Sequence, residues 1–133
     1  MEVFQSITLF LGGALLVFAG TMRLLRPSGS LCLDTFLSDS SNDLRNDQDL
    51  TSEMRGAGVI TALFGIVALS GILAPEMRLT SLISTTIFYL GYALGRGVSW
   101  VADGEPTKRT KQGFGFEIVL GSLNAISLVS ALI

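Results

Sequence analysis

The sequence predicts an all-α protein, an integral membrane four-helix bundle whose helices run alternately up and down. Of the 133 residues, 49% are hydrophobic and 15% charged, and the mean hydropathy of +0.58 is too high for an ordinary soluble domain of this size. The apolar residues are gathered in four stretches, each long enough to cross a hydrocarbon layer of about 30 Å as a helix. Polar segments separate these stretches, and we expect a single membrane domain over residues 1–133.

The first helix is predicted at about residues 3–25. Val3 to Thr21 is uncharged, and Arg23 is the one charge before Leu25. A secretory signal peptide is the alternative interpretation. However, the leader holds Glu2 and no basic residue, and the apolar run exceeds the roughly 7–15 residues of a signal core. We therefore expect this helix to be a retained membrane span.

A polar loop rich in Ser, Asp and Asn is predicted at residues 26–51. We favour a loop resting on lipid headgroups, with an interfacial turn, a re-entrant cover or a partner contact as alternatives for its apolar side chains. Those side chains are Leu31, Leu33, Phe36 and Leu37. Cys32 is the single cysteine of the chain, which excludes an internal disulfide.

The second helix is predicted at about residues 52–74, and its only charges are Glu53 and Arg55 near its start. A face of small residues follows Arg55 at spacings of three or four, which suits close contact with a neighbouring helix. These residues are Gly58, Ala62 and Gly65. Arg55 is accordingly predicted to point into the bundle. For Glu53, capping of the helix dipole is an alternative to a functional role.

The third helix is predicted at about residues 79–102, and Arg96 interrupts its apolar sequence. Two stripes run along it. One is a small-residue seam at four-residue intervals, formed by Gly91, Gly95 and Ser99. The other is aromatic and basic, formed by Tyr89, Tyr92, Arg96 and Trp100.

The fourth helix is predicted at about residues 113–133, after a charged hairpin at 103–113. Glu117 is its sole charge. Asn124 lies seven residues further on and shares the face of Glu117, so we expect both polar groups to face the bundle.

Alternating helix directions bring five charged residues to one end of the bundle: Arg23, Glu53, Arg55, Arg96 and Glu117. A charge near a helix centre costs about 2.5–3.5 kcal/mol on insertion scales, so these residues need partners or a wet cavity. Glu117 is the natural partner of Arg96 or Arg55. A purely structural ion network and a binding pocket both remain open.

Basic residues near the helix ends predict the orientation. The end that carries the charged cluster holds six of them, whereas the opposite end holds only Arg78. Because basic residues favour the cytoplasmic side, the cluster should be cytoplasmic and both termini should lie outside.

Several motifs together resemble a known family. They are Glu53-Met54-Arg55 followed by glycines, Gly95-Arg96, Asp103-Gly104-Glu105-Pro106 and Phe116-Glu117. In order and spacing they are similar to small bacterial membrane proteins catalogued as domain of unknown function 4345. The resemblance implies a four-helix integral protein of the bacterial inner membrane with charged residues at the family's polar positions, and it supplies no reaction or ligand.

We therefore expect a protein that binds a small amphipathic or anionic ligand, or a membrane lipid, at the cytoplasmic end of the bundle. The candidate residues are Glu53, Arg55, Tyr89, Tyr92, Arg96, Glu117 and Asn124, with Arg23 at the periphery. The alternative is a structural accessory subunit of a larger membrane complex, in contact with other subunits or with a second copy of the chain.

Composition argues against other functions. The chain has no His, which removes the usual general base and the commonest metal ligand, and no nucleophile, metal set or cofactor fingerprint accompanies the acids. We therefore expect no enzyme, metal or cofactor. A net charge of −2 offers no basic face for nucleic acid.

Overall fold

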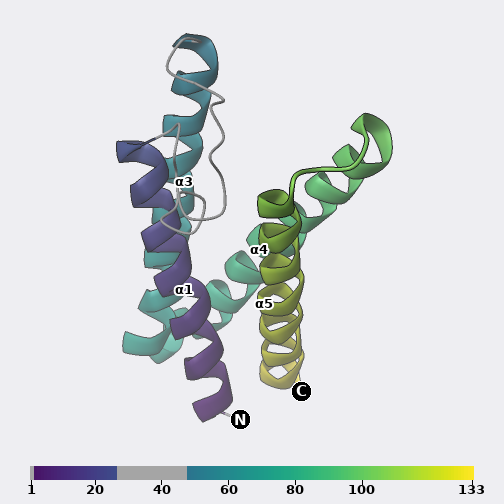
Figure 1. The fold of residues 1–133 in the computed structure, drawn as a ribbon. Coiled ribbons are helices and arrows are strands. Elements are labelled where there is room, and N and C mark those ends of the chain that lie inside the picture. Colours follow the sequence, from purple (N-terminus) through teal and green to yellow (C-terminus); the bar gives the residue numbers. More distant parts are fainter. Residues whose placement is uncertain (1, 27–47) are drawn as a thin grey trace.

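The computed structural model describes residues 2–26 and 48–133, and these residues form four long α-helices. In chain order they are α1 (Glu2–Leu25), α3 (Gln48–Leu73), α4 (Arg78–Asp103) and α5 (Lys108–Leu132), with the short 3-10 helix η2 (Pro75–Met77) joining α3 to α4. Successive helices run in opposite directions, and both chain ends lie at the same end of the molecule (Figure 1). The predicted all-α architecture is confirmed for the described chain. Most of the predicted polar loop, residues 27–47, lies outside the described residues. This part includes Cys32 and the apolar side chains of the loop.

Two helices begin earlier than the hydropathy pattern predicts. Helix α3 begins at Gln48 instead of about 52, and α5 begins at Lys108 instead of about 113. The charged segment predicted as a hairpin is therefore helical in its second half. Thr107 explains the early start of α5, because its extended backbone ends the turn and its hydroxyl oxygen accepts a hydrogen bond from the Thr110 amide.

The turn between α4 and α5 is short and is held by side chains. Gly104 has φ of 100°, a conformation that suits glycine, directly after the last residue of α4. Glu105 forms an ion pair with Lys111 in the second turn of α5. The hydrogen bond from Lys111 and its positive charge lower the pKa of Glu105. The Lys111 ammonium also lies 5.6 Å from the ring centroid of Trp100, which ties α5 to the end of α4.

Helices α1 and α3 form the first tightly packed pair. A β-carbon on Gly58 would lie 2.7 Å from the carbonyl oxygen of Gly20, and one on Gly20 would lie 2.4 Å from the amide nitrogen of Ala62. Gly65 makes an equally close approach to Gly13. The small-residue face predicted on α3 therefore packs directly against the backbone of α1.

Helices α4 and α5 form the second pair, where Gly121 lies against Leu90. The glycine seam predicted on α4 does not contribute to this contact. Around Gly91 and Gly95, a β-carbon would meet no heavy atom of the described residues within 4 Å. The small-residue spacing therefore marks an open face of α4.

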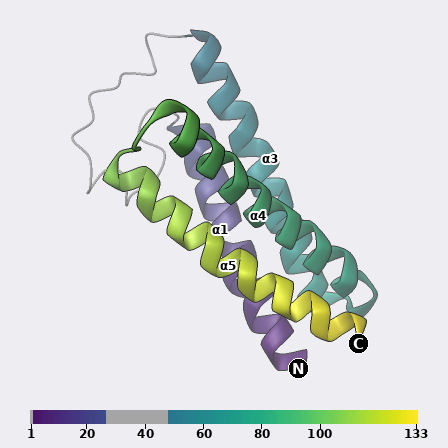
Figure 2. The ribbon, with the colours of Figure 1, turned by 90° about the vertical axis from the view of Figure 1, so that its right-hand side faces the viewer.

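The two helix pairs meet through buried polar side chains. The hydroxyls of Thr8 on α1 and Ser127 on α5 lie 2.9 Å apart, and the Gln5 amide donates to the Ser130 hydroxyl at 2.9 Å. Both contacts are near the chain ends. Toward the opposite end the pairs diverge in Figure 1, and Figure 2 shows the same pairs one in front of the other.

Polar residues fill much of the interior, while most large apolar residues lie outside. Fully buried side chains include Thr8, Ser81, Thr85, Asn124 and Ser127. Exposed ones include Ile7, Phe10, Ile66, Ile87, Leu94 and Ile126. In the described part of the chain, three helical segments are long and apolar enough to cross a membrane: Glu2–Leu25, Thr51–Leu73 and Lys108–Leu132. The fourth predicted span, α4, is not among them; it is of similar length, and its buried residues include Ser81, Thr85 and Thr86.

Candidate functional site

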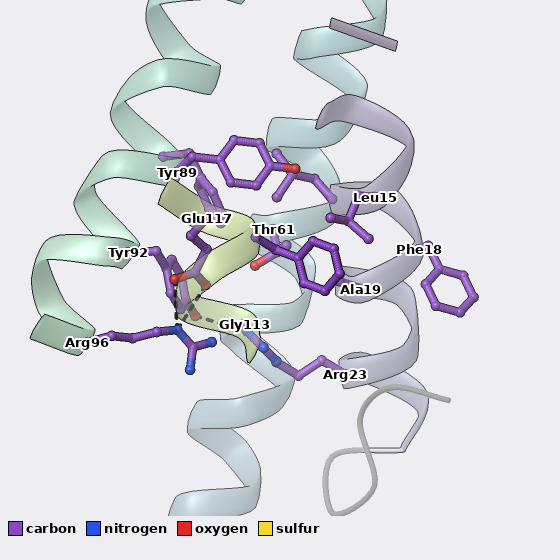
Figure 3. Close-up of a pocket in the computed structure, with 13 residues that line it drawn as sticks. Leu15, Phe18, Ala19, Arg23, Thr61, Tyr89, Tyr92, Arg96, Gly113 and Glu117 are labelled. Carbon is purple, nitrogen blue, oxygen red and sulfur yellow. Dashed lines mark hydrogen bonds and ion pairs between the residues drawn. The ribbon is translucent and has the colours of Figure 1, made fainter. Parts of the chain in front are cut away.

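A cavity of about 190 Å³ lies between the two helix pairs, on the side where they diverge (Figure 3). All four helices line it. Its lining residues are Leu15, Leu16, Phe18, Ala19 and Arg23 from α1, Thr61 from α3, Phe88, Tyr89, Tyr92 and Arg96 from α4, and Gly113, Phe116 and Glu117 from α5. The cavity therefore has an apolar wall and one charged end.

Arg96 and Glu117 form an ion pair at the charged end. The Nε atom of Arg96 donates to Oε1 of Glu117 at 2.9 Å and lies 2.9 Å from Oε2. The two side chains are 25% and 13% exposed, so the pair is largely removed from solvent. This is one of the two pairings that the sequence left open for Glu117, and it joins α4 to α5.

Arg23 approaches the same place from α1, although the sequence suggested only a peripheral position. Its Nη1 donates to the Tyr92 hydroxyl at 2.9 Å. The guanidinium carbons of Arg23 and Arg96 lie 5.9 and 5.4 Å from the Tyr92 ring centroid, within cation–π range. Tyr92 thus holds two cations beside one another, as Figure 3 shows.

Tyr89 lines the cavity with its ring, but its hydroxyl is already engaged. It donates to the carbonyl oxygen of Gly12 at 2.6 Å, and the residue is 2% exposed. Tyr89 therefore contributes an apolar surface and links α4 to α1.

Asn124 shares a helix face with Glu117 but is not among the residues that line the cavity. It is fully buried, and its amide nitrogen donates to the Leu120 carbonyl at 2.8 Å. It also lies close to the backbone of Gly12. Asn124 is seven residues further along α5 than Glu117. It therefore lies where the two helix pairs are in tight contact and not where they diverge.

Glu53 and Arg55 do not join the cluster, and the prediction that Arg55 points into the bundle is wrong. Both residues are exposed and neither lines the cavity. Arg55 instead donates from Nη1 to the carbonyl of Leu24, at the end of α1. The last carbonyls of a helix lack partners within it and favour a cation, which accounts for this contact. The first turns of α3 are also far from α4 and α5, because the pairs diverge there (Figure 1).

Comparison with known proteins agrees with the motifs. A family model described as Domain of unknown function (DUF4345) matches residues 4–128. The chain belongs to this family. No curated protein and no solved structure matches this chain. The match to the DUF4345 family includes all of the residues that line the cavity.

The apolar wall of this DUF4345 protein was not predicted as part of a site. Phe88 stacks near Tyr92 with ring centroids 5.2 Å apart, and it stands four residues earlier on the same helix face. That spacing is a signal that sequence analysis could have used. Leu15, Phe18 and Phe116 carry no such signal, because large apolar residues are also frequent on the exposed sides of these helices.

The cavity combines a small number of charged side chains with an apolar wall. Within residues 2–26 and 48–133, no group of three or more His, Cys, Asp or Glu side chains is placed to hold a metal ion. Glu117, the one carboxylate among the described residues that line the cavity, is engaged by Arg96. A charged end joined to an apolar wall can accommodate a molecule with a polar head and an apolar body.

Proposed function

We propose that this DUF4345 protein is a multi-pass protein of the bacterial inner membrane that binds a small amphipathic or anionic ligand, or a lipid, in the cavity between its helix pairs. The observation that carries the proposal is the composition of the cavity wall. Arg23, Arg96 and Glu117 stand at one end, and mostly apolar and aromatic side chains form the remainder. An amphipathic molecule matches both parts.

The distribution of side chains supports insertion into a membrane. Large apolar residues cover the outside of the helices, and small and hydroxyl residues occupy the contacts between them. In lipid there is no hydrophobic gain from bringing helices together, so close packing and interhelical hydrogen bonds must hold them. The glycine contacts of α1 with α3 and the Thr8–Ser127 hydrogen bond are interactions of this kind.

Native mass spectrometry of the protein released from membranes tests the proposal. We expect the parent protein to carry a co-purifying amphiphile. Ala19→Leu adds three carbons to a residue of the cavity wall, and we expect it to reduce the bound fraction several-fold. Ala102→Leu is the matched control, because Ala102 is exposed near the end of α4 and does not line the cavity.

Two outcomes would contradict ligand binding in the cavity. One is a parent protein that carries no small molecule under conditions that preserve other lipid complexes. The other is an equal loss of ligand in Ala19→Leu and Ala102→Leu, which would place the ligand elsewhere on the surface.

A structural accessory subunit is the second candidate, and the open face of α4 favours it. Glycines at 91 and 95 would let another helix approach closely, and no described residue of the chain occupies that place. In this case the same mass spectrum should show stoichiometric foreign subunits or a second copy. Gly95→Leu should release them, whereas cavity variants should not.

Both termini are expected to lie outside the cytoplasm. They stand at the same end of the molecule, opposite the end with Arg23, Arg26, Lys108, Arg109 and Lys111 (Figure 1). Basic residues favour the cytoplasmic side. Paired reporter fusions after Ile133 measure the orientation: alkaline phosphatase should be active and a cytoplasm-dependent fluorescent protein dark. The reverse pattern would overturn the orientation.

A further inference from the structure

We propose that the cavity selects an amphiphile with a single alkyl chain and an anionic head, a carboxylate or a phosphate, and that Arg23 holds the anion. This inference rests on the proposed function and names its ligand class. It follows from the charge that remains after the internal contacts of the cavity are made.

The charges of the cavity do not balance. Arg96 is neutralised by Glu117 at 2.9 Å. Among the described residues, Arg23 has only the neutral Tyr92 hydroxyl as an acceptor, at 2.9 Å. Its Nε is buried and has no hydrogen-bond acceptor among the described residues. Among the described residues that line the cavity, two cations and one carboxylate leave an excess of positive charge, so an anion would complete the site.

Arg23 is turned toward the cavity, which argues against a purely interfacial role. An arginine near a helix end can extend its side chain to the headgroup region and need no partner in the protein. Here the guanidinium points toward Tyr92 instead, and the guanidinium groups of Arg23 and Arg96 both lie near the Tyr92 ring (Figure 3). A partly buried guanidinium that lacks a negatively charged partner is unfavourable, and its planar donors suit carboxylate or phosphate.

The apolar wall defines the other part of the ligand. Arg23 stands in the last turn of α1, and Leu16 and Leu15 lie about 10 Å deeper along the helix axis. The head of a ligand would therefore lie near the membrane surface and its chain would extend toward the middle, as for a lipid of that leaflet. Phe18 and Phe116 are 46% and 52% exposed, so this wall is also open toward surrounding lipid.

The size of the cavity favours one chain. Its volume of about 190 Å³ is below the roughly 300–1,000 Å³ of typical small-molecule sites. A single alkyl chain entering through the open side fits this space better than a lipid with two chains.

The test uses the purified protein in phosphatidylcholine nanodiscs and measures binding by native mass spectrometry and thermal shift. The probes are dodecanoate and dodecyl phosphate as anionic amphiphiles, dodecanol and dodecylphosphocholine as neutral and zwitterionic ones, and acetate and inorganic phosphate as free anions. We expect both anionic amphiphiles to bind at least ten-fold more tightly than dodecanol, since a hydrogen-bonded charge pair is worth that factor or more. Acetate and phosphate should not bind measurably.

Arg23→Gln should reduce the affinity for the anionic amphiphiles about ten-fold or more and leave dodecanol binding unchanged. Arg26→Gln is the matched control, because Arg26 is exposed one turn away and does not line the cavity. If Arg23→Gln fails to fold, Arg23→Lys retains the charge and should keep the preference for anions over dodecanol.

Each contrary result identifies what has failed. Equal binding of dodecanol and dodecanoate would overturn the inference and leave the proposed function intact. Tight binding of inorganic phosphate, with no gain in affinity from an alkyl chain, would contradict the inference that the ligand is an amphiphile. Unchanged anion preference in Arg23→Gln would overturn the role of Arg23. Failure of every amphiphile to bind would contradict the proposed function itself.

Discussion

Gly58→Ala is expected to lower the free energy of unfolding by about 1–3 kcal/mol, the usual cost of overpacking a close contact. The new β-carbon would lie 2.7 Å from the Gly20 carbonyl oxygen and 2.8 Å from the Leu24 amide nitrogen. These are backbone atoms that cannot rotate away, so α1 and α3 must separate along their whole seam. Thermal unfolding in detergent, followed by circular dichroism, measures the loss.

Gly56→Ala on the same helix is the matched control. At Gly56 a β-carbon would meet no heavy atom of the described residues within 4 Å. Alanine is also favoured over glycine in a helix by about 0.5–1 kcal/mol. Gly56→Ala should therefore be neutral or slightly stabilising. Equal destabilisation by both substitutions would show that helix propensity, and not the contact with α1, decides the effect.

The seam between α1 and α3 was predictable because its signal is local. Gly58, Ala62 and Gly65 recur every three or four residues, and only one face of a helix can collect them. Gly91 and Gly95 on α4 are also four residues apart, but a β-carbon at either position would meet no heavy atom of the described chain within 4 Å. Spacing identifies a face that another helix can approach, but it does not identify which helix approaches it.

The first residues of α3 and α5 were predicted too late in the sequence, because an apolar stretch and a helix need not begin at the same residue. An apolar run marks where a helix can cross lipid, whereas backbone hydrogen bonding continues through charged residues until a cap or a turn stops it. In α5 that limit is Thr107, six residues before the predicted start at 113. Its capping interaction is with Thr110, and both residues are visible in the sequence.

The polar cluster was predicted in part. The prediction that successive helices alternate in direction correctly placed Arg23, Arg96 and Glu117 at one end of the bundle. That prediction required only the number and order of the helices. It could not give the angle between the helix pairs. That angle leaves Glu53 and Arg55 outside the cavity, and it also opens the space that the apolar side chains line (Figure 1).

Arg96→Ala and Glu117→Ala are each expected to destabilise the protein by about 3 kcal/mol, the lower end of the range for breaking a buried ion pair. The lower end is appropriate because the Arg96 side chain remains 25% exposed. Either substitution leaves the opposite charge without its partner between α4 and α5. The double variant removes both charges, so its loss should be smaller than the sum of the single losses by about 1–3 kcal/mol.

The exposed pair of opposite charges at the same end, Glu53 and Arg55, provides a control cycle. These residues were predicted to belong to the same cluster, but they lie outside the cavity and Arg55 contacts a backbone carbonyl. Their single and double alanine variants should therefore be additive within about 0.5 kcal/mol. Thermal or denaturant unfolding of all six variants in one detergent gives both coupling energies. Additive effects at Arg96 and Glu117 would mean that each charge is satisfied by water or lipid, and the ion pair would then contribute nothing to holding the two helices beside the cavity.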